Sequence, residues 1–167
     1  MHGVVLVGHG GIAKDCPVEL VSKFKRLEAQ RRAAGVPPSA EERELDATIR
    51  QWPRTAATDP YRAGLEAVGA ALRPLLDGAL FALAYNEFCA PSVEESIEGL
   101  IRQGATRITV ATTMFTPGGA HSELEIPEIL HGVRGRHPEV SIQYAWPFDP
   151  STLAQILNEQ VRRFMSR

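Results

Sequence analysis

Short apolar runs alternate along the chain with longer amphipathic stretches. The runs occupy positions 4–7, 79–85, 107–112 and 140–145, and each is too short for a typical helix. The unbroken apolar runs at 4–7 and 79–85 predict strands buried on both faces, as in a parallel sheet, and 107–112 and 140–145 predict two further strands. Stretches with apolar residues at helical spacing lie between and after them. The order therefore predicts an α/β fold with a four-stranded parallel sheet, helices on both of its faces and flavodoxin-like layering. The pattern does not determine the order of the strands.

The connection between the first two predicted strands is unusually long. Asp15 as N-cap, with Pro17 in the first turn, predicts a helix that ends at Gly35. Asp59 and Pro60 predict the start of a second long helix. A parallel crossover needs only one helix, so we expect one domain over residues 1–167 with a helical insertion at about 35–58.

The insertion itself shows a helical pattern. Ser39 to Glu42 match a capping box, and Leu45 and Ile49 form an apolar pair behind it. This patterning is unlike a disordered linker, so we expect a small helical flap packed against the domain or against a second copy. A surface ornament and a lid over the cleft are equally compatible with the sequence. Deleting 38–54 would spare activity in the first case and weaken substrate binding in the second.

Composition and charge narrow the classes of partner. The formal charge of −2 and the pI near 6.2 give no reason to expect a nucleic acid or an anionic membrane as partner. No apolar run approaches the roughly 20 residues that span a bilayer, and no secretory signal is visible. Cys16 and Cys89 form no CxxC motif, so we expect reduced thiols and a cytoplasmic protein.

Candidate chemistry follows three of the predicted strands. His9 comes after the first strand, Glu87 after the second, and His121 ends the loop after the third. Strand-to-helix loops of a parallel sheet lie at one edge, so these side chains are expected to meet there. Two nitrogens and one oxygen suit Co, Fe, Ni or Zn, and three protein ligands leave coordination positions open.

Each residue also has a simpler interpretation. A histidine after a buried strand is more often a hydrogen-bonded structural residue than a ligand, and Glu87 can cap the next helix. His2 is terminal, and we expect His131 and His137 at the surface of the opposite edge.

Three motifs, taken in order, resemble one enzyme family. Positions 4–10 (VVLVGHG), 86–92 (NEFCAPS) and 114–127 (MFTPGGAHSELEIP) are similar to the strand-end motifs of the small sirohydrochlorin chelatases, the class II chelatases of CbiX and SirB type. The resemblance covers most of the chain apart from roughly 35–58. It implies a chelatase-like domain that inserts Co, Fe or Ni into a tetrapyrrole.

The resemblance also implies roles for individual residues. His9, Glu87 and His121 would bind the metal and accept the protons that the macrocycle loses, without ATP or a permanently bound cofactor. The metal is a substrate, and the tetrapyrrole is the second one. One-domain relatives pair as dimers, so a homodimer is expected, with no nucleic acid and no membrane as partner.

Two departures from the family pattern bear on the substrate. The family continues its first motif with Ser-Arg, whereas Gly11-Ile12 stand here, and the insertion is extra. We assign substrate contacts to Gly10, Lys14, Met114 and Phe115, with Met114, Phe115 and Phe148 lining either the macrocycle or the dimer interface.

Three other functions have some support in the sequence pattern. A non-catalytic metal or tetrapyrrole binder on the same fold fits the missing Ser-Arg pair. An esterase would need a G-x-S-x-G nucleophile elbow, and a phosphate binder would need a G-x-G-x-x-G or Walker loop; the chain has none of these.

Overall fold

The computed structural model describes residues 1–165. Four strands form one fully parallel sheet in the order β2-β1-β3-β4. They are β1 (His2–Gly8), β2 (Leu80–Tyr85), β3 (Arg107–Thr112) and β4 (Ser141–Tyr144). The predicted α/β fold and its four strands are confirmed. The central position of β1 and β3 places the ends of β1, β2 and β3 side by side.

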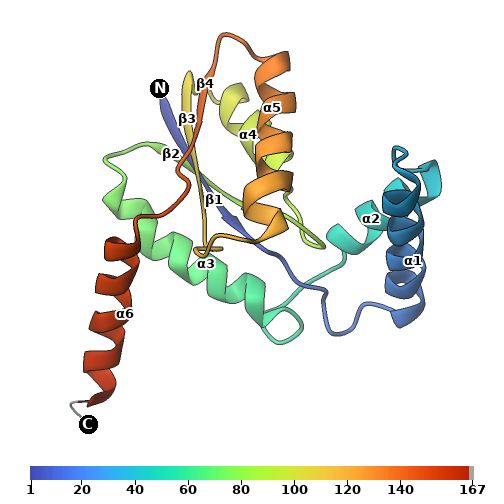
Figure 1. The fold of residues 1–167 in the computed structure, drawn as a ribbon, viewed down its shortest axis with the longest axis horizontal. Coiled ribbons are helices and arrows are strands. Elements are labelled where there is room, and N and C mark those ends of the chain that lie inside the picture. Colours follow the sequence, from blue (N-terminus) through green and yellow to red (C-terminus); the bar gives the residue numbers. More distant parts are fainter. Residues whose placement is uncertain (166–167) are drawn as a thin grey trace.

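One face of the sheet is covered by α4 (Val93–Arg102) and α5 (Ile126–Arg136), as Figure 1 shows. A capping box starts α4, because the Ser92 hydroxyl accepts from the Glu95 amide while the Glu95 carboxylate accepts from the Ser92 amide. The apolar residues between these helices and the sheet form the main core. Its fully buried members include Val5, Val7, Ile97, Leu100, Ile108, Val110, Leu130 and Val133.

The opposite face is covered by α3 (Pro60–Leu72), which continues into a short 3₁₀ turn, η1 (Arg73–Leu75). Asp59 caps α3 as predicted, since its carboxylate accepts from the Arg62 amide. Leu65 packs there against Leu6 and Tyr85. Helices thus lie on both faces, as the alternation of elements predicted.

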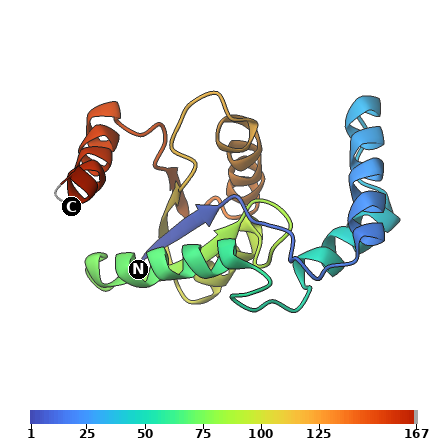
Figure 2. The same ribbon diagram turned by 90° about the horizontal axis from the view of Figure 1, so that it is seen from below.

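The helices α1 (Val18–Ala34) and α2 (Ala40–Arg50) pair with each other beyond the carboxyl end of β1 (Figures 1 and 2). We call residues 12–58 the α1–α2 unit. Its small core joins Phe24 of α1 to Ile49 of α2, which is fully buried. Because α3 alone forms the crossover on the sheet, the part that stands apart from the sheet includes α1 and begins before residue 35.

One local prediction about α1 is wrong. The helix starts at Val18 with Pro17 as its N-cap residue and no side-chain cap, so Asp15 does not cap it. Val18 in its first turn is 72% exposed, because α1 rests on α2 and not on the sheet.

The last helix, α6 (Pro150–Met165), forms where the sequence predicts it but covers no face of the sheet. Figure 2 shows it at the opposite end of the molecule from α1. None of its residues is buried, and Ile156, Leu157 and Val161 are more than half exposed. Its apolar side is therefore not matched by the described part of this chain.

Candidate metal centre

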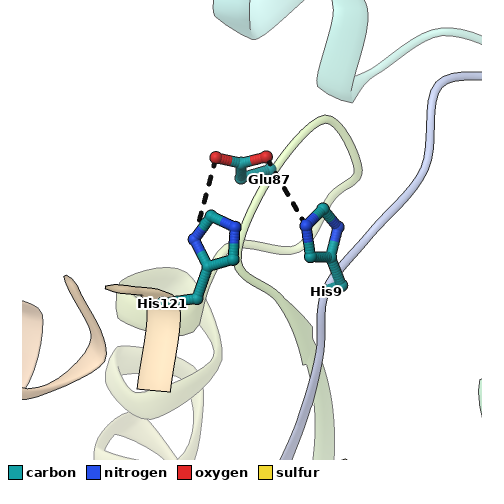
Figure 3. Close-up of side chains that lie close together, drawn as sticks. All are labelled: His9, Glu87 and His121. Carbon is teal, nitrogen blue, oxygen red and sulfur yellow. Dashed lines mark ion pairs between the residues drawn. The ribbon is translucent and has the colours of Figure 1, made fainter. Parts of the chain in front are cut away.

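The carboxyl ends of β1, β2 and β3 bring His9, Glu87 and His121 together, as the topology predicted. His9 Nε2 lies 3.9 Å from Glu87 Oε2, and His121 Nδ1 lies 3.9 Å from Glu87 Oε1. The two imidazole rings meet edge to face, with their centroids 4.7 Å apart. One ligand atom from each residue lies within 4.8 Å of the others. Figure 3 shows both rings directed toward the carboxylate from separate loops.

A close approach of two main-chain loops sets this distance. Gly10 has φ of +95°, and a Cβ there would stand 1.9 Å from the Glu87 carbonyl oxygen. The Glu87 amide donates to the His9 carbonyl over 2.8 Å, and the Asn86 amide donates to the Gly8 carbonyl over 2.9 Å. Position 10 thus needs glycine for both conformation and space. Its predicted contact with substrate stays a prediction.

The His9 ring is oriented by its own loop. Its Nδ1 lies 2.8 Å from the Gly10 carbonyl, which only accepts, so this nitrogen carries the proton. The Nε2 lone pair is then left facing Glu87 and is available to a metal. The His9 amide also donates to the Tyr61 hydroxyl on α3, over 2.7 Å. No local pattern indicated Tyr61, which lies 52 positions away.

His121 opens a π-helical turn, η2 (His121–Glu125), that leads directly into α5. The sequence indicated a loop up to this point; instead, the helix begins early and one turn is widened. The Tyr144 hydroxyl donates to the Ser122 carbonyl over 3.0 Å and ties this turn to β4. Burial raises the pKa of Tyr144 to about 12, so it remains a donor at any physiological pH.

Glu125 is the residue that orients His121. Its Oε2 lies 2.8 Å from His121 Nδ1 and also accepts from the Asn86 amide group over 2.8 Å. Asn86 Nδ2 also lies 3.0 Å from His121 Nδ1, so Glu125 and Asn86 both engage this nitrogen and Nε2 is left open to a metal. The sequence alone leaves open whether Glu123 or Glu125 joins the metal site. In the structure, Glu123 instead accepts from the Gly118 amide.

The charge on Glu125 is stabilised by its surroundings. Burial alone would raise its pKa, but hydrogen bonds from His121 and Asn86 and the nearby Arg32 guanidinium lower it below the ordinary value. Arg32 comes from α1, with Nη2 3.4 Å from Glu125 Oε1. The α1–α2 unit thus reaches the candidate centre electrostatically.

Aromatic side chains line the loops after β3 and β4. Phe115 and Phe148 meet edge to face at 5.0 Å between centroids, and Trp146 lies 6.0 Å from Phe148 and 6.2 Å from Tyr144. We call these four residues the aromatic group. The sequence suggested Phe115 and Phe148 but missed Trp146, whose position depends on how two distant loops meet. Met114 packs largely against the α4–α5 core, and Lys14 is exposed.

The other histidines lie outside this cluster, and His137, which was expected at the surface, is half-buried. His2 contacts Thr109, His137 pairs with Glu98, and His131 is exposed on α5. Within residues 1–165, no helix is both long and apolar enough to cross a bilayer.

Comparisons with known proteins agree on one family. The model of the CbiX family matches residues 55–164. The chain is 32% identical over 87 residues to the sirohydrochlorin ferrochelatase of Priestia megaterium, a match that covers 52% of this chain and 32% of the relative. It is 34% identical over 65 residues to the sirohydrochlorin ferrochelatase of Bacillus subtilis strain 168, covering 39% of this chain and 24% of the relative. The chain thus matches at most about a third of the length of these relatives.

Solved structures show the same fold. The sirohydrochlorin chelatase SirB from Bacillus subtilis subspecies spizizenii, in complex with cobalt, aligns with a TM-score of 0.52 and 20% identity over 87% of this chain and 43% of its own. The CbiX protein from Marinobacter aquaeolei VT8 aligns with a TM-score of 0.57 and 17% identity over 100% of this chain and 99% of its own. At these identities the likeness concerns the fold alone. Glu87 and His121 lie within the family match, whereas His9 and most of the α1–α2 unit precede it.

Proposed function

Because this chain belongs to the CbiX family, we propose that it is a chelatase that inserts Co, Fe or Ni into a tetrapyrrole of the sirohydrochlorin type. One observation carries the proposal: His9, Glu87 and His121 bring ligand atoms within 4.8 Å of one another from three separate loops. Two imidazole nitrogens and a carboxylate oxygen suit these borderline metals.

The arrangement favours transfer of a metal over permanent storage. Three protein ligands leave coordination positions for water and for the incoming pyrrole nitrogens. The side chains of His9, Glu87 and His121 are 41%, 20% and 26% exposed, so a large planar substrate has access to them.

Insertion exchanges one divalent cation for the two N–H protons of the macrocycle. As the metal leaves its protein ligands, the freed His9 Nε2 and the Glu87 carboxylate become proton acceptors beside the pyrrole nitrogens. Glu125 holds His121 through Nδ1 and leaves Nε2 open to the metal. The released protons pass from these groups to solvent at the open rim.

The aromatic group supplies a surface for the macrocycle. Aromatic faces stack on planar π-systems, and Phe115, Trp146 and Phe148 lie on two loops at the same edge as the candidate metal centre. We assign further substrate contacts to Gly10, Met114 and the ammonium of Lys14. Lys14 would take the place of the family arginine, because Gly11 stands at the family serine position and Ile12 packs in the core of the α1–α2 unit.

We also propose that the protein acts as a homodimer in the cytoplasm. The exposed apolar side of α6 supports the dimer, since Ile156, Leu157 and Val161 are 56%, 66% and 53% exposed. A second copy of the chain offers a matching apolar helix, and a two-fold contact would cover both.

The missing Ser-Arg pair favours a second candidate function, a non-catalytic protein that binds metal or tetrapyrrole on the same fold. Incubating the purified protein with sirohydrochlorin and Co²⁺, Fe²⁺ or Ni²⁺, and following the absorption spectrum, separates the two. A chelatase accelerates metal insertion over many turnovers, whereas a binder shifts the spectrum in proportion to protein.

Variants test the site itself. His9→Ala, Glu87→Gln and His121→Ala are each expected to abolish metal-dependent turnover, while His131→Ala, which removes an exposed histidine of α5, should leave it unchanged. Wild-type turnover in all three site variants would refute the proposed site.

A further inference from the structure

Two arginines at the end of the α1–α2 unit point back into the loops of the candidate centre. Arg54 is 1% exposed and pairs over 2.5 Å with Asp59, which is 2% exposed. Arg50 pairs over 2.8 Å with Asp46 on its own helix. Neither guanidinium lies among the three proposed metal ligands, so their role in the molecule is a separate question.

The Arg54 guanidinium joins the His9 loop to the Glu87 loop. Its Nη1 donates to the Gly11 carbonyl over 2.7 Å, two positions after His9. Its Nη2 donates to the carbonyl of Phe88, the residue directly after Glu87, and also to the Ile49 carbonyl. A single rigid side chain thus contacts the main chain beside two proposed ligands.

Arg50 contacts two further carbonyls of the Glu87 loop. Its Nη2 donates to the Asn86 carbonyl over 3.0 Å, and its Nη1 donates to the Cys89 carbonyl over 3.1 Å. Together, the two arginines fix the carbonyls of the residues on both sides of Glu87. We call Arg50 and Arg54 the arginine clamp.

The Glu87 loop needs such support because its backbone is strained. Phe88 has φ of +57°, a left-handed conformation that is unfavourable for a bulky residue. The clamp's hydrogen bonds hold the peptide planes in this conformation, and the Phe88 ring packs with the core of the α1–α2 unit. If this support were lost, the loop would relax and Glu87 would move away from the histidines.

Contact with several carbonyls at once requires an arginine. Its planar fork offers five N–H donors in fixed directions, whereas the lysine ammonium is a compact charge on a flexible stem. In the buried position of Arg54 a lysine retains the charge opposite Asp59 but does not reach all the carbonyls at once.

We propose that Arg54, assisted by Arg50, is a positioning residue that holds Glu87 and His9 at the separation a divalent metal requires. The α1–α2 unit is then a part of the metal centre's scaffold and neither an ornament nor a lid. This inference rests on the proposed metal site, and its test is arranged so that the two fail separately.

The test measures binding of Co²⁺ alone to the chain of residues 1–167, by titration calorimetry and by the visible absorption of bound Co²⁺. Arg54→Lys is expected to weaken Co²⁺ binding 10- to 100-fold, the range typical of residues that orient metal ligands, and to alter the cobalt spectrum. Arg54→Ala is expected to show the same loss and to recover part of its affinity when guanidinium is added at millimolar concentration. If Arg54→Ala does not fold, Arg54→Lys decides the question.

The matched control is Arg31→Lys. Arg31 forms a pair with the buried Glu42 over 2.7 Å inside the same α1–α2 unit, and it contacts neither site loop. It should reproduce any general loosening of the unit while retaining wild-type Co²⁺ affinity and spectrum.

Two results would overturn the proposed role of Arg54 or the proposed metal site. If His9→Ala loses Co²⁺ binding but Arg54→Lys matches Arg31→Lys, the clamp is purely structural and this inference fails alone. If His9→Ala binds Co²⁺ like the wild type, the proposed metal site itself is wrong and the inference falls with it.

Discussion

Two segments with apolar residues at helical spacing lie outside the layers of the sheet, the α1–α2 unit and α6. Their apolar residues are buried in the first and exposed in the second. In the first, Phe24 is 7% exposed and Ile49 fully buried, because the two helices cover each other and the Glu87 loop. In the second, Leu157 is 66% exposed. An apolar stripe therefore predicts a helix and a need for cover, but the partner is decided by tertiary structure.

The largest effect that separates the two segments is expected in stability. Ile49→Ala should lower the free energy of unfolding by about 2–5 kcal/mol, because it leaves a cavity in a closed cluster. The matched change on α6, Leu157→Ala, should cost less than about 0.5 kcal/mol in dilute protein, because the side chain buries little there. Urea denaturation of both variants measures the difference. Equal losses would show that α6 is packed in solution.

The second expected effect concerns the metal site, which the α1–α2 unit reaches through the Arg32–Glu125 pair. Glu125→Ala should weaken Co²⁺ binding about 10- to 100-fold, since His121 loses the carboxylate that helps to orient its ring. Glu128→Ala removes the same charge from the exposed side of α5 and should have no effect. Calorimetric titration with Co²⁺ decides between them. An unchanged affinity in Glu125→Ala would mean that Asn86 alone orients His121.

The third effect concerns the proposed dimer contact through the apolar side of α6. Leu157→Asp places a charge in the middle of its apolar side and should weaken a dimer at least about tenfold. Gln155→Asp adds the same charge on the opposite side of the helix and should leave association unchanged. Sedimentation equilibrium across protein concentrations measures the constant. A wild-type protein that remains monomeric throughout would remove α6 as a dimer contact.

Much of the molecule was accessible from the sequence for a simple reason. Apolar runs specify buried strands, parallel topology brings their carboxyl ends to one edge, and His9, Glu87 and His121 follow three of those strands. Their convergence therefore requires only that the three strands are neighbours in the sheet, whatever their exact order. Capping signals are equally local, and Asp59 was assigned correctly.

The supporting residues could not be predicted in this way. Tyr61 contacts His9, which lies 52 positions away, and Arg54 contacts Phe88, which lies 34 positions away, so both contacts depend on the tertiary fold. Glu125 contacts His121, only four positions away. Glu125 was missed as His121's partner because its i, i+4 relation depends on the π-helical turn, which the pattern indicated as loop. Asp15 was wrongly assigned as the N-cap because the preference of aspartate for helix starts is a statistical tendency that does not fix the exact first residue.

The smallest effect concerns the start of α6, where the absence of buried residues leaves the helix dependent on local stabilisation. The Asp149 carboxylate accepts from the Ser151 hydroxyl and from both the amide and the hydroxyl of Thr152. The hydrogen bond from Ser151, followed by those from Thr152, lowers the pKa of Asp149. The cap is therefore ionised and complete at neutral pH.

The sign of the pH dependence follows from that shift. A lowered folded-state pKa means that the capping contribution is fully present above the unfolded value of about 3.9 and is lost as the pH falls through the lower folded value. Asp149→Asn retains an acceptor but does not titrate, so its first helical turn should be independent of pH in this range. Cα chemical shifts of residues 150–154 followed from pH 7 to pH 2 measure both proteins. The wild-type turn should fray on acidification while the asparagine variant stays constant, and a parallel response in the two would assign the acid sensitivity to another group. Because α6 buries no residue, the midpoint of global unfolding at neutral pH should be the same for both proteins, in contrast to the loss expected for Ile49→Ala.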